Sequence, residues 1–311
     1  MLRDTLLQMS RSARVRDVVE RAPVTRSVVH RFVPGSDVAD AVRAAGELTA
    51  SHRLVTVDHL GEDTLDLEAA RATRDAYRTL LTQMSDAGLT EGGRVEVSVK
   101  LSAVGQALEG DGEKIALEHA WDICSAAQQV GTTVTLDMED HTTTDSTLSV
   151  LRELRSDYPG VGAVLQAYLR RTESDCRDLA TAGSRVRLCK GAYNEPASVA
   201  FTDKAEVDRS YVRCLKVLLN GDGYPMLATH DPRLIDIAGA LAARAGRAET
   251  TYEYQMLYGI RPEEQQRLAD QGHLMRVYLP YGADWYGYFM RRLAERPANV
   301  AFFLRSLATR S

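Results

Sequence analysis

Short apolar, β-branched runs alternate with longer segments of helical spacing along the chain. Eight such runs recur, and each precedes a polar or ionisable residue: 54–57 before Asp58, 95–99 before Lys100, 133–136 before Asp137, 161–165 before Gln166, 186–189 before Lys190, 225–229 before His230, 250–252 before Glu253 and 274–277 before Tyr278. Apolar positions recur at helical spacing between them, over 66–87, 113–130, 148–157, 203–220 and 232–245. Strands that alternate with helices in this way build βαβ units, and eight units close into a parallel barrel.

The polar residues that follow the eight runs are expected to converge at one end of this barrel. Active sites of such barrels form at the carboxyl ends of the strands, where these residues would lie. We predict an α/β fold, a regular or distorted TIM-type (β/α)8 barrel, over residues 51–311, preceded by an N-terminal helical arm over residues 1–50. Pro34 and Gly35 interrupt the arm, and residues 37–51 are expected to form a short helix before the first strand.

Composition and charge exclude several classes of protein. With 44% hydrophobic and 26% charged residues, the chain resembles an ordinary globular protein. The formal net charge of -5 and the lack of basic runs with interleaved aromatic residues argue against a nucleic-acid partner. No apolar run is long enough to predict a transmembrane helix. The four cysteines lack metal-site spacing and are expected to be reduced, which favours a cytoplasmic location.

Two interpretations of the N-terminal arm stay open. Residues 1–34 contain seven arginines and lack the apolar centre of a secretory signal. One interpretation is that the apolar positions of the arm pack against the barrel; these are Leu6, Leu7, Val15, Val18, Val19, Val28 and Val29. The other is that arginines beside an apolar stripe hold the protein peripherally on the inner face of the cell membrane.

An anion-binding pattern occupies residues 187–193, whereas GxGxxG, GxxxxGK[ST], HExxH and GxSxG motifs are absent from the chain. Arg187 and Lys190 are followed by Gly191, Ala192 and a tyrosine. Strand alternation directs the two cations to different surroundings, and the two small residues let the backbone approach a ligand closely. We interpret this strand end as part of a binding site.

Residues 136–141 contain three carboxylates and a histidine, which raises the question of a metal site. Asp137 and Glu139 face the same side, but no HxH or HxxxH pair accompanies them, so no metal is expected. Asp137 is interpreted as a lone carboxylate in the barrel mouth that orients a cation or accepts a hydrogen bond from a cofactor. His230, just before the helix that begins at Pro232, is either structural or a cofactor contact, and we favour the contact.

The end of the chain combines aromatic residues with two adjacent arginines. A helix predicted over residues 285–295 carries Tyr288, Arg291, Arg292 and Glu295. Arg291 and Glu295 are spaced for a surface ion pair of little energetic value. The aromatic residues around the arginine pair, Tyr278 among them, favour instead a site for a small carboxylate beside an apolar ring.

Together these segments resemble the proline dehydrogenase family, in particular its monofunctional bacterial members. The segments that carry the resemblance are VSVKLS at 97–102, LDMED at 136–140, LQAY at 165–168, RLCKGAY at 187–193, ATHD at 228–231, YEYQMLYG at 252–259, RVY at 276–278 and RRLAE at 291–295. The resemblance implies a flavoenzyme that binds FAD non-covalently and oxidises L-proline to 1-pyrroline-5-carboxylate, the first step of proline catabolism to glutamate. A hydride would pass from proline C5 to flavin N5, and the electrons to a membrane quinone.

The resemblance also implies a role for individual residues. Lys100, Arg291 and Arg292 would bind the proline carboxylate, and Tyr278 and Tyr288 would pack on the pyrrolidine ring. Catalytic roles are implied for Asp137, near the substrate pocket, and Arg187, near flavin N5. FAD contacts are implied for Met138, Gln166, Arg187, Lys190, Gly191, Ala192, Thr229, His230 and Glu295. Glu62 resembles the glutamate that pairs with an arginine of the last helix and acts as a gate.

Some alternatives and limits follow from the residues. The chain is too short for the second domain of the bifunctional relatives, so the product must leave or pass to a partner such as pyrroline-5-carboxylate dehydrogenase. The bulk of Tyr278 is expected to favour proline over hydroxyproline. A strand-end lysine, Lys100 or Lys190, would also suit a Schiff-base lyase. A flavin- or amino-acid-binding protein without turnover is a third interpretation.

Overall fold

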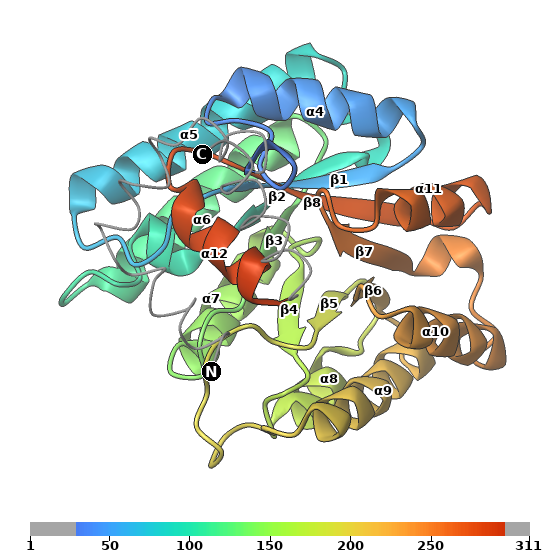
Figure 1. Cartoon of the computed structure of the whole chain (residues 1–311). Helices are drawn as coiled ribbons and strands as arrows, with labels where there is room; N and C mark the ends of the chain where they lie inside the picture. The colour runs from blue at the N-terminus through green and yellow to red at the C-terminus, as the bar shows by residue number, and fades with distance from the viewer. Residues whose placement is uncertain (1–28, 296–311) are drawn as a thin grey trace, which may run out of the picture.

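Eight parallel strands form the centre of the molecule in the computed structural model, which describes residues 29–295 (Figure 1). The strands are β1 Leu54–His59, β2 Val95–Val99, β3 Val134–Leu136, β4 Ala163–Gln166, β5 Arg185–Cys189, β6 Tyr224–Ala228, β7 Glu253–Leu257 and β8 Met275–Tyr281. They are ordered β3-β2-β1-β8-β7-β6-β5-β4, and a parallel bridge between Thr135 and Gly162 joins the two end strands. The predicted (β/α)8 barrel is therefore confirmed.

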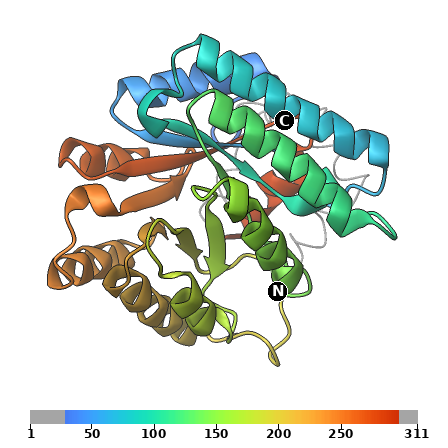
Figure 2. The same ribbon diagram turned by 180° about the vertical axis from the view of Figure 1, so that it is seen from behind.

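Helices surround the strands (Figures 1 and 2). They are α4 Val38–Ala50, α5 Leu67–Asp86, α6 Gly112–Gln129, α7 Thr144–Asp157, α8 Thr172–Leu179, α9 Lys204–Asn220, α10 Pro232–Arg244, α11 Pro262–Asp270 and α12 Trp285–Glu295. Aspartate caps begin three of them: Asp66, Asp203 and Asp231 each accept hydrogen bonds from the first turn of α5, α9 and α10. Among residues 29–295, no helix has the length and apolar character needed to cross a membrane.

The barrel strands are apolar outside and polar inside. In β2, Val95, Val97 and Val99 belong to the core between strands and helices, while Glu96 and Ser98 bond to residues of other strands across the interior. The period-two alternation of side chains produces this separation. Barrel interiors are more often filled by branched apolar residues. Here ionisable side chains occupy the interior of the barrel, beside the candidate active site.

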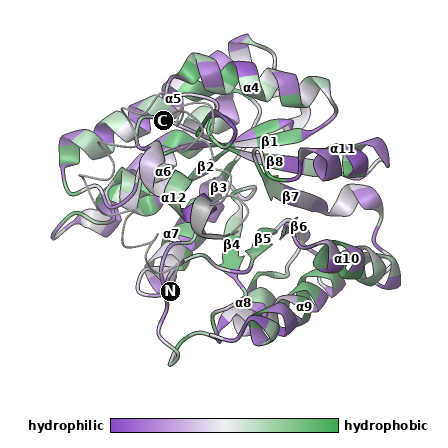
Figure 3. Ribbon diagram, in the orientation of Figure 1, coloured by the Kyte–Doolittle hydropathy of each residue, from purple (hydrophilic) through white to green (hydrophobic). Residues whose placement is uncertain are grey.

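Three elements differ from the sequence-based expectation. The seventh strand begins at Glu253, because the residues before it form a 3-10 turn, Glu249–Thr251. Glu253 therefore lies at the amino end of β7, and its predicted position at the mouth was wrong. The helices α8 and α11 were not predicted; they are short, with eight and nine residues, and α11 is mainly hydrophilic (Figure 3).

The described end of the N-terminal arm packs on α12. Val29, Phe32 and Val33 share an apolar cluster with Tyr288 and Phe289 of that helix. The other apolar positions singled out in the arm lie outside the described residues, so only Val29 bears on the packing interpretation, which it supports. The predicted short helix is α4, of which Ala41, Ala44 and Ala45 are buried in the main core. The helix α12 lies in front of the strands in Figure 1 and behind them in Figure 2.

Candidate active site

Asp137, immediately after β3, is the centre of a buried polar cluster inside the barrel. Its Oδ1 accepts hydrogen bonds from Ser98 Oγ at 2.7 Å and from Arg187 Nη1 at 2.7 Å. Its Oδ2 accepts from the Tyr278 hydroxyl at 2.6 Å and lies 3.7 Å from Lys100 Nζ. Strands β2, β5 and β8 thus direct side chains from distant parts of the chain onto one carboxylate. Lys100 and Arg187, predicted to meet in the mouth, do so here.

Lys100 is a permanently charged cation. Its Nζ donates to Asp58 Oδ2 at 2.7 Å, and the side chain is only 10% exposed. Burial alone would lower the pKa of Lys100, but Asp58, Asp137 and Glu62 outweigh it and raise the pKa above its ordinary value. An amine nucleophile requires the opposite shift. The group is suited to holding an anion.

Arg187 crosses the barrel interior from β5. Besides its contact with Asp137, its Nε donates to Gln255 Oε1 at 2.6 Å, and its guanidinium lies 5.2 Å from the centre of the Tyr278 ring. Its Nη2 is buried and has no hydrogen-bond partner among the described residues. Glu96 Oε1 lies 3.8 Å from this nitrogen. The hydrogen-bonding capacity of this nitrogen is therefore unused within the described residues.

A second charged layer lies below the site, at the amino ends of the strands. Glu96 accepts a hydrogen bond from Arg185, and Arg276 Nε donates to Glu253 Oε1 at 2.7 Å. Burial opposes ionisation of Glu96, but Arg185, Arg276 and Arg187 outweigh it and lower its pKa to about 2. Glu96 therefore stays ionised and balances part of the charge of these arginines.

The helix α12 contributes a second group of candidate residues. Arg291 donates through both terminal nitrogens to the Glu62 carboxylate, one of the bonds being 3.2 Å long. The guanidinium of Arg292 lies 5.0 Å from the centre of the Tyr288 ring. The pairing of Glu62 with an arginine of the last helix agrees with the resemblance noted in the sequence.

Electrostatic influence connects this group with the cluster around Asp137. Burial raises the pKa of Tyr193 most, and Glu62, Glu139 and Asp137 raise it further, while Arg291 lowers it. Glu62 also contributes to the raised pKa of Lys100. Charges from both groups therefore act on Tyr193.

The segment after β5 is held in place by several contacts. Glu195 accepts hydrogen bonds from the backbone and ring of His141 and from the Tyr168 hydroxyl. Gly191 has a φ of 112°, which L side chains rarely adopt, and a Cβ there would lie 2.3 Å from the Tyr168 ring. Lys190 Nζ contacts Asp208 at 2.5 Å, away from Asp137, so the predicted divergence of Arg187 and Lys190 is confirmed.

The other positions assigned to FAD lie at neighbouring strand ends. Gln166 Nε2 donates to the Glu139 carbonyl at 2.6 Å, and Met138 is buried. Thr229 Oγ1 accepts from the Asp231 amide at 3.1 Å. His230 Nε2 accepts from the Leu257 amide at 2.9 Å, which gives the ring a structural bond. Ala192 is exposed, and the side chain of Glu295 lies outside the described part of the chain.

Sequence reasoning missed several residues of the site. Ser98 and Gln255 bond directly to the central ion pair, and neither was singled out in the sequence. The available signal was the alternation of polar and apolar residues inside runs that we treated as uniformly apolar. Glu96, Ser98 and Lys100 follow one another at every second position.

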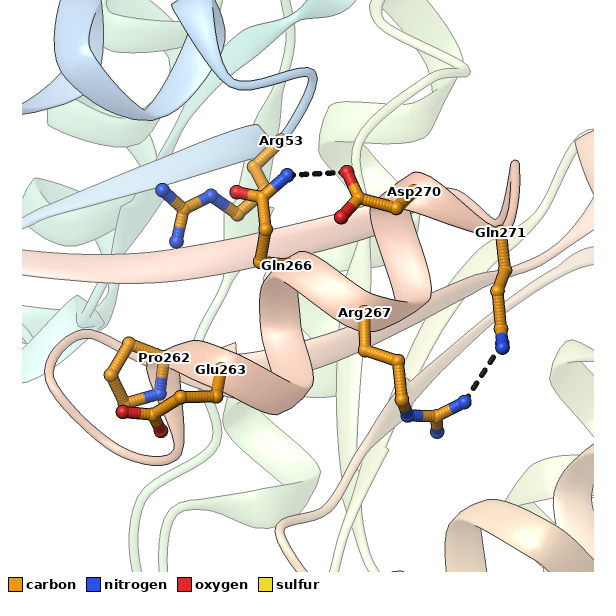
Figure 4. Close-up of a pocket in the computed structure, with 7 residues that line it drawn as sticks. All are labelled: Arg53, Pro262, Glu263, Gln266, Arg267, Asp270 and Gln271. Atoms are coloured by element: carbon orange, nitrogen blue, oxygen red, sulfur yellow. Dashed lines mark hydrogen bonds between the residues drawn. The ribbon is translucent and has the colours of Figure 1, made fainter.

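Other candidate sites do not compete with this one. Within the described residues, no group of three or more His, Cys, Asp or Glu is arranged for a metal ion. A shallow surface pocket is lined by Arg53 and residues of α11 (Figure 4). Its side chains bond mainly along the helix, as Gln266 does with Asp270 and Arg267 with Gln271. Arg53 immediately precedes β1, so this pocket lies near the amino end of that strand, whereas Asp137 follows the carboxyl end of β3.

Comparisons with known proteins agree on one family. A family model described as proline dehydrogenase matches residues 41–305. Proline dehydrogenase 1 of Bacillus subtilis is 38% identical over 307 residues, 99% of each chain. Proline dehydrogenase of Deinococcus radiodurans is 40% identical over 283 residues, 90% of each chain. The solved structure of proline utilization A from Bdellovibrio bacteriovorus, inactivated by N-propargylglycine, matches with a TM-score of 0.80 at 27% identity, over 87% of this chain and 33% of its own.

Proposed function

The chain belongs to the proline dehydrogenase family and is an enzyme of that class, and we propose that it uses non-covalently bound FAD to oxidise L-proline to 1-pyrroline-5-carboxylate. The observation that carries this proposal is the convergence of Lys100, Arg187 and Tyr278 on Asp137, beneath a helix that contains two arginines. Such a site can hold a small carboxylate and position the ring attached to it.

The residues of the site fit a flavin. The buried Nη2 of Arg187 has no hydrogen-bond partner among residues 29–295, and it can donate to a ring atom of the cofactor. Gly191 has a backbone conformation that L side chains rarely adopt and packs against the Tyr168 ring, which fixes the path of this strand end. We assign FAD contacts to this set: Met138, Gln166, Arg187, Lys190, Gly191, Ala192, Thr229, His230 and Glu295. Bound FAD would supply the acceptor for the hydride that leaves C5 of proline.

Substrate binding is assigned to cations of the cluster around Asp137 and of helix α12. Lys100, held ionised by Asp58 and Asp137, provides a fixed positive charge for the proline carboxylate. Arg291 and Arg292 of α12 would contact the same carboxylate. Burial disfavours the charge on Arg291, but Glu62 and Tyr193 outweigh it and raise its pKa, so it stays ionised.

The pair between Glu62 and Arg291 would act as a gate. Both nitrogens that Arg291 would offer a carboxylate are bonded to Glu62. A substrate carboxylate must therefore compete with Glu62 for this guanidinium, and binding opens the pair. Tyr278 and Tyr288 would pack against the pyrrolidine ring, with Asp137 holding the Tyr278 hydroxyl in place.

A membrane quinone would accept the electrons from the reduced flavin. The product would pass to a pyrroline-5-carboxylate dehydrogenase. A quinone that dissolves in the bilayer requires the enzyme to reach a membrane surface, which the arginine-rich residues 1–28 suit. Deletion of these residues is expected to reduce pelleting with anionic liposomes while proline oxidation with a soluble acceptor continues. Equal pelleting of the full chain and the deletion variant would show that residues 1–28 are not needed for membrane binding.

Absorbance of the purified protein tests cofactor, substrate and reaction together. We expect a yellow protein whose flavin absorbance is bleached by proline without oxygen and stays unchanged with buffer alone. A colourless protein that is trapped by borohydride with an aldehyde would indicate a Schiff-base lyase. Flavin absorbance that proline does not bleach would indicate a binding protein without turnover.

A further inference from the structure

A chain of hydrogen bonds inside the barrel leads from the lower charged layer to Arg187. Gln255, on β7, is 3% exposed and lies in the middle of this chain. Its Oε1 accepts from Arg187 Nε at 2.6 Å, and its Nε2 donates to Glu253 Oε1 at 2.5 Å. Glu253 is held in turn by Arg276 Nε at 2.7 Å. Gln255 is thus separated from the candidate substrate and cofactor contacts by one residue, Arg187.

An amide group is well matched to this position. It has an acceptor at one end and a donor at the other, and here a cation faces the acceptor and a carboxylate faces the donor. The reversed orientation would place oxygen against the Glu253 carboxylate and N–H groups against Arg187. The two charges therefore select one orientation of Gln255, and the amide cannot flip without losing both bonds.

The bond from Gln255 limits the orientations of the Arg187 guanidinium. Asp137 and Ser98 hold Nη1, and Gln255 holds Nε on the adjacent edge of the same planar group. Two edges fixed from opposite sides of the barrel define the plane and the direction of the remaining donor, Nη2. A cation held in this way acts on a bound ring system from a constant position.

We propose that Gln255 is a positioning residue that fixes the Arg187 guanidinium and thereby raises the reduction potential of the bound flavin. The inference rests on the proposed function, because it requires FAD beside Arg187. A cation fixed near the flavin favours the form that has gained electrons. A cation released to swing toward Asp137 alone has a weaker effect. Loss of Gln255 should therefore make the midpoint potential more negative.

A purely structural role for Gln255 predicts a different result. Loss of two buried hydrogen bonds would lower the stability of the fold wherever they were located. Gln265 offers a matched control, because it is 1% exposed and its Nε2 donates to the carbonyls of Leu257 and Ile260 at 3.0 and 2.9 Å. It bonds to the turn between β7 and α11 and does not contact Arg187.

The experiment compares the holoenzymes of wild type, Gln255→Met, Gln255→Asn and Gln265→Met. The midpoint potential of bound FAD is measured by spectroelectrochemistry. The values of kcat and KM for proline are measured by steady-state kinetics with a soluble electron acceptor. We expect a more negative potential in both Gln255 variants and, in Gln255→Met, a roughly tenfold lower kcat, as for the loss of one charge-assisted bond. The KM should stay within about twofold, because the carboxylate contacts are intact. Gln265→Met should keep the wild-type potential.

The outcomes separate this inference from the function on which it rests. If proline does not reduce the wild-type flavin, the proposed function fails, and the inference fails with it. If proline reduces the wild type but both Gln255 variants keep its potential, only the inference is overturned. An equal shift in Gln265→Met would also overturn it, because the effect would then be general. Gln255→Asn keeps an amide in the barrel and decides the question if Gln255→Met does not fold.

Discussion

Replacing Asp137 with asparagine should remove a charge from the barrel interior while it preserves the shape of the side chain. The remaining amide oxygen can still accept from Ser98 and Arg187, and the new NH2 group faces the Tyr278 hydroxyl, whose oxygen can accept. The loss is therefore electrostatic. Arg187 would lose its nearest carboxylate, whereas Lys100 would keep Asp58 at 2.7 Å.

The cost of this substitution follows from burial. Removing one partner of a buried ion pair costs about 3–5 kcal/mol, because the other charge stays in a poorly solvated place. Arg187 is 5% exposed in its side chain and Asp137 is 11% exposed. Since the hydrogen bonds are retained in neutral form, we expect the lower end, about 3 kcal/mol of unfolding free energy. The same change should lower kcat/KM for proline, because Arg187 and Tyr278 lose their common anchor.

A surface pair of the same residue types provides the control. Asp145 accepts from Arg171 at 2.6 Å, but its side chain is 86% exposed. Asp145→Asn should therefore cost less than about 1 kcal/mol. Urea unfolding of the flavin-free proteins, followed by tryptophan fluorescence, measures both values without a contribution from cofactor binding. Equal losses for the two variants would refute the argument that burial of the Asp137 pair determines its contribution.

Three further predictions concern α12 and the mouth. Arg291→Met and Arg292→Met should each abolish detectable proline affinity while FAD stays bound; equilibrium titration of each variant with proline measures this, and unchanged affinity would exclude that arginine. Glu62→Gln should speed proline association in rapid-mixing experiments, since substrate no longer competes with a carboxylate for Arg291; an unchanged rate would argue against the gate. Burial, partly offset by bonds from Ser102, raises the pKa of Glu139 from 4.5 to about 7. The folded protein retains this proton where the unfolded chain loses it, so stability should fall by up to about 3 kcal/mol between pH 4.5 and 7, and Glu139→Gln should lack this component in urea titrations across that range.

Much of the barrel was predictable because strand and helix periods are local properties of the chain. The runs at 95–99 and 186–189 match β2 and most of β5, and residues 285–295 form α12 as expected. Helices with a strong apolar period, such as α5 and α9, were found to within a few residues of their ends. The short α11 escaped prediction because it has nine mostly polar residues, of which only Gln265 and Leu268 are buried. The position of Glu253 in the charged layer at the amino ends of the strands was missed, because a 3-10 turn shifts the start of β7.

The linear order of residues was enough to identify a barrel enzyme with polar strand ends, because alternation and helix periodicity act over a few neighbours. It also contained the Lys100, Asp137 and Arg187 that meet in the centre. Which charges become partners depended on strand register and on closure of the barrel. Glu62 meets Arg291 across 229 positions, and Gln255 reaches Arg187 across 68. Such pairings arise only when distant strands are brought side by side, since no local pattern specifies which polar residues will face each other.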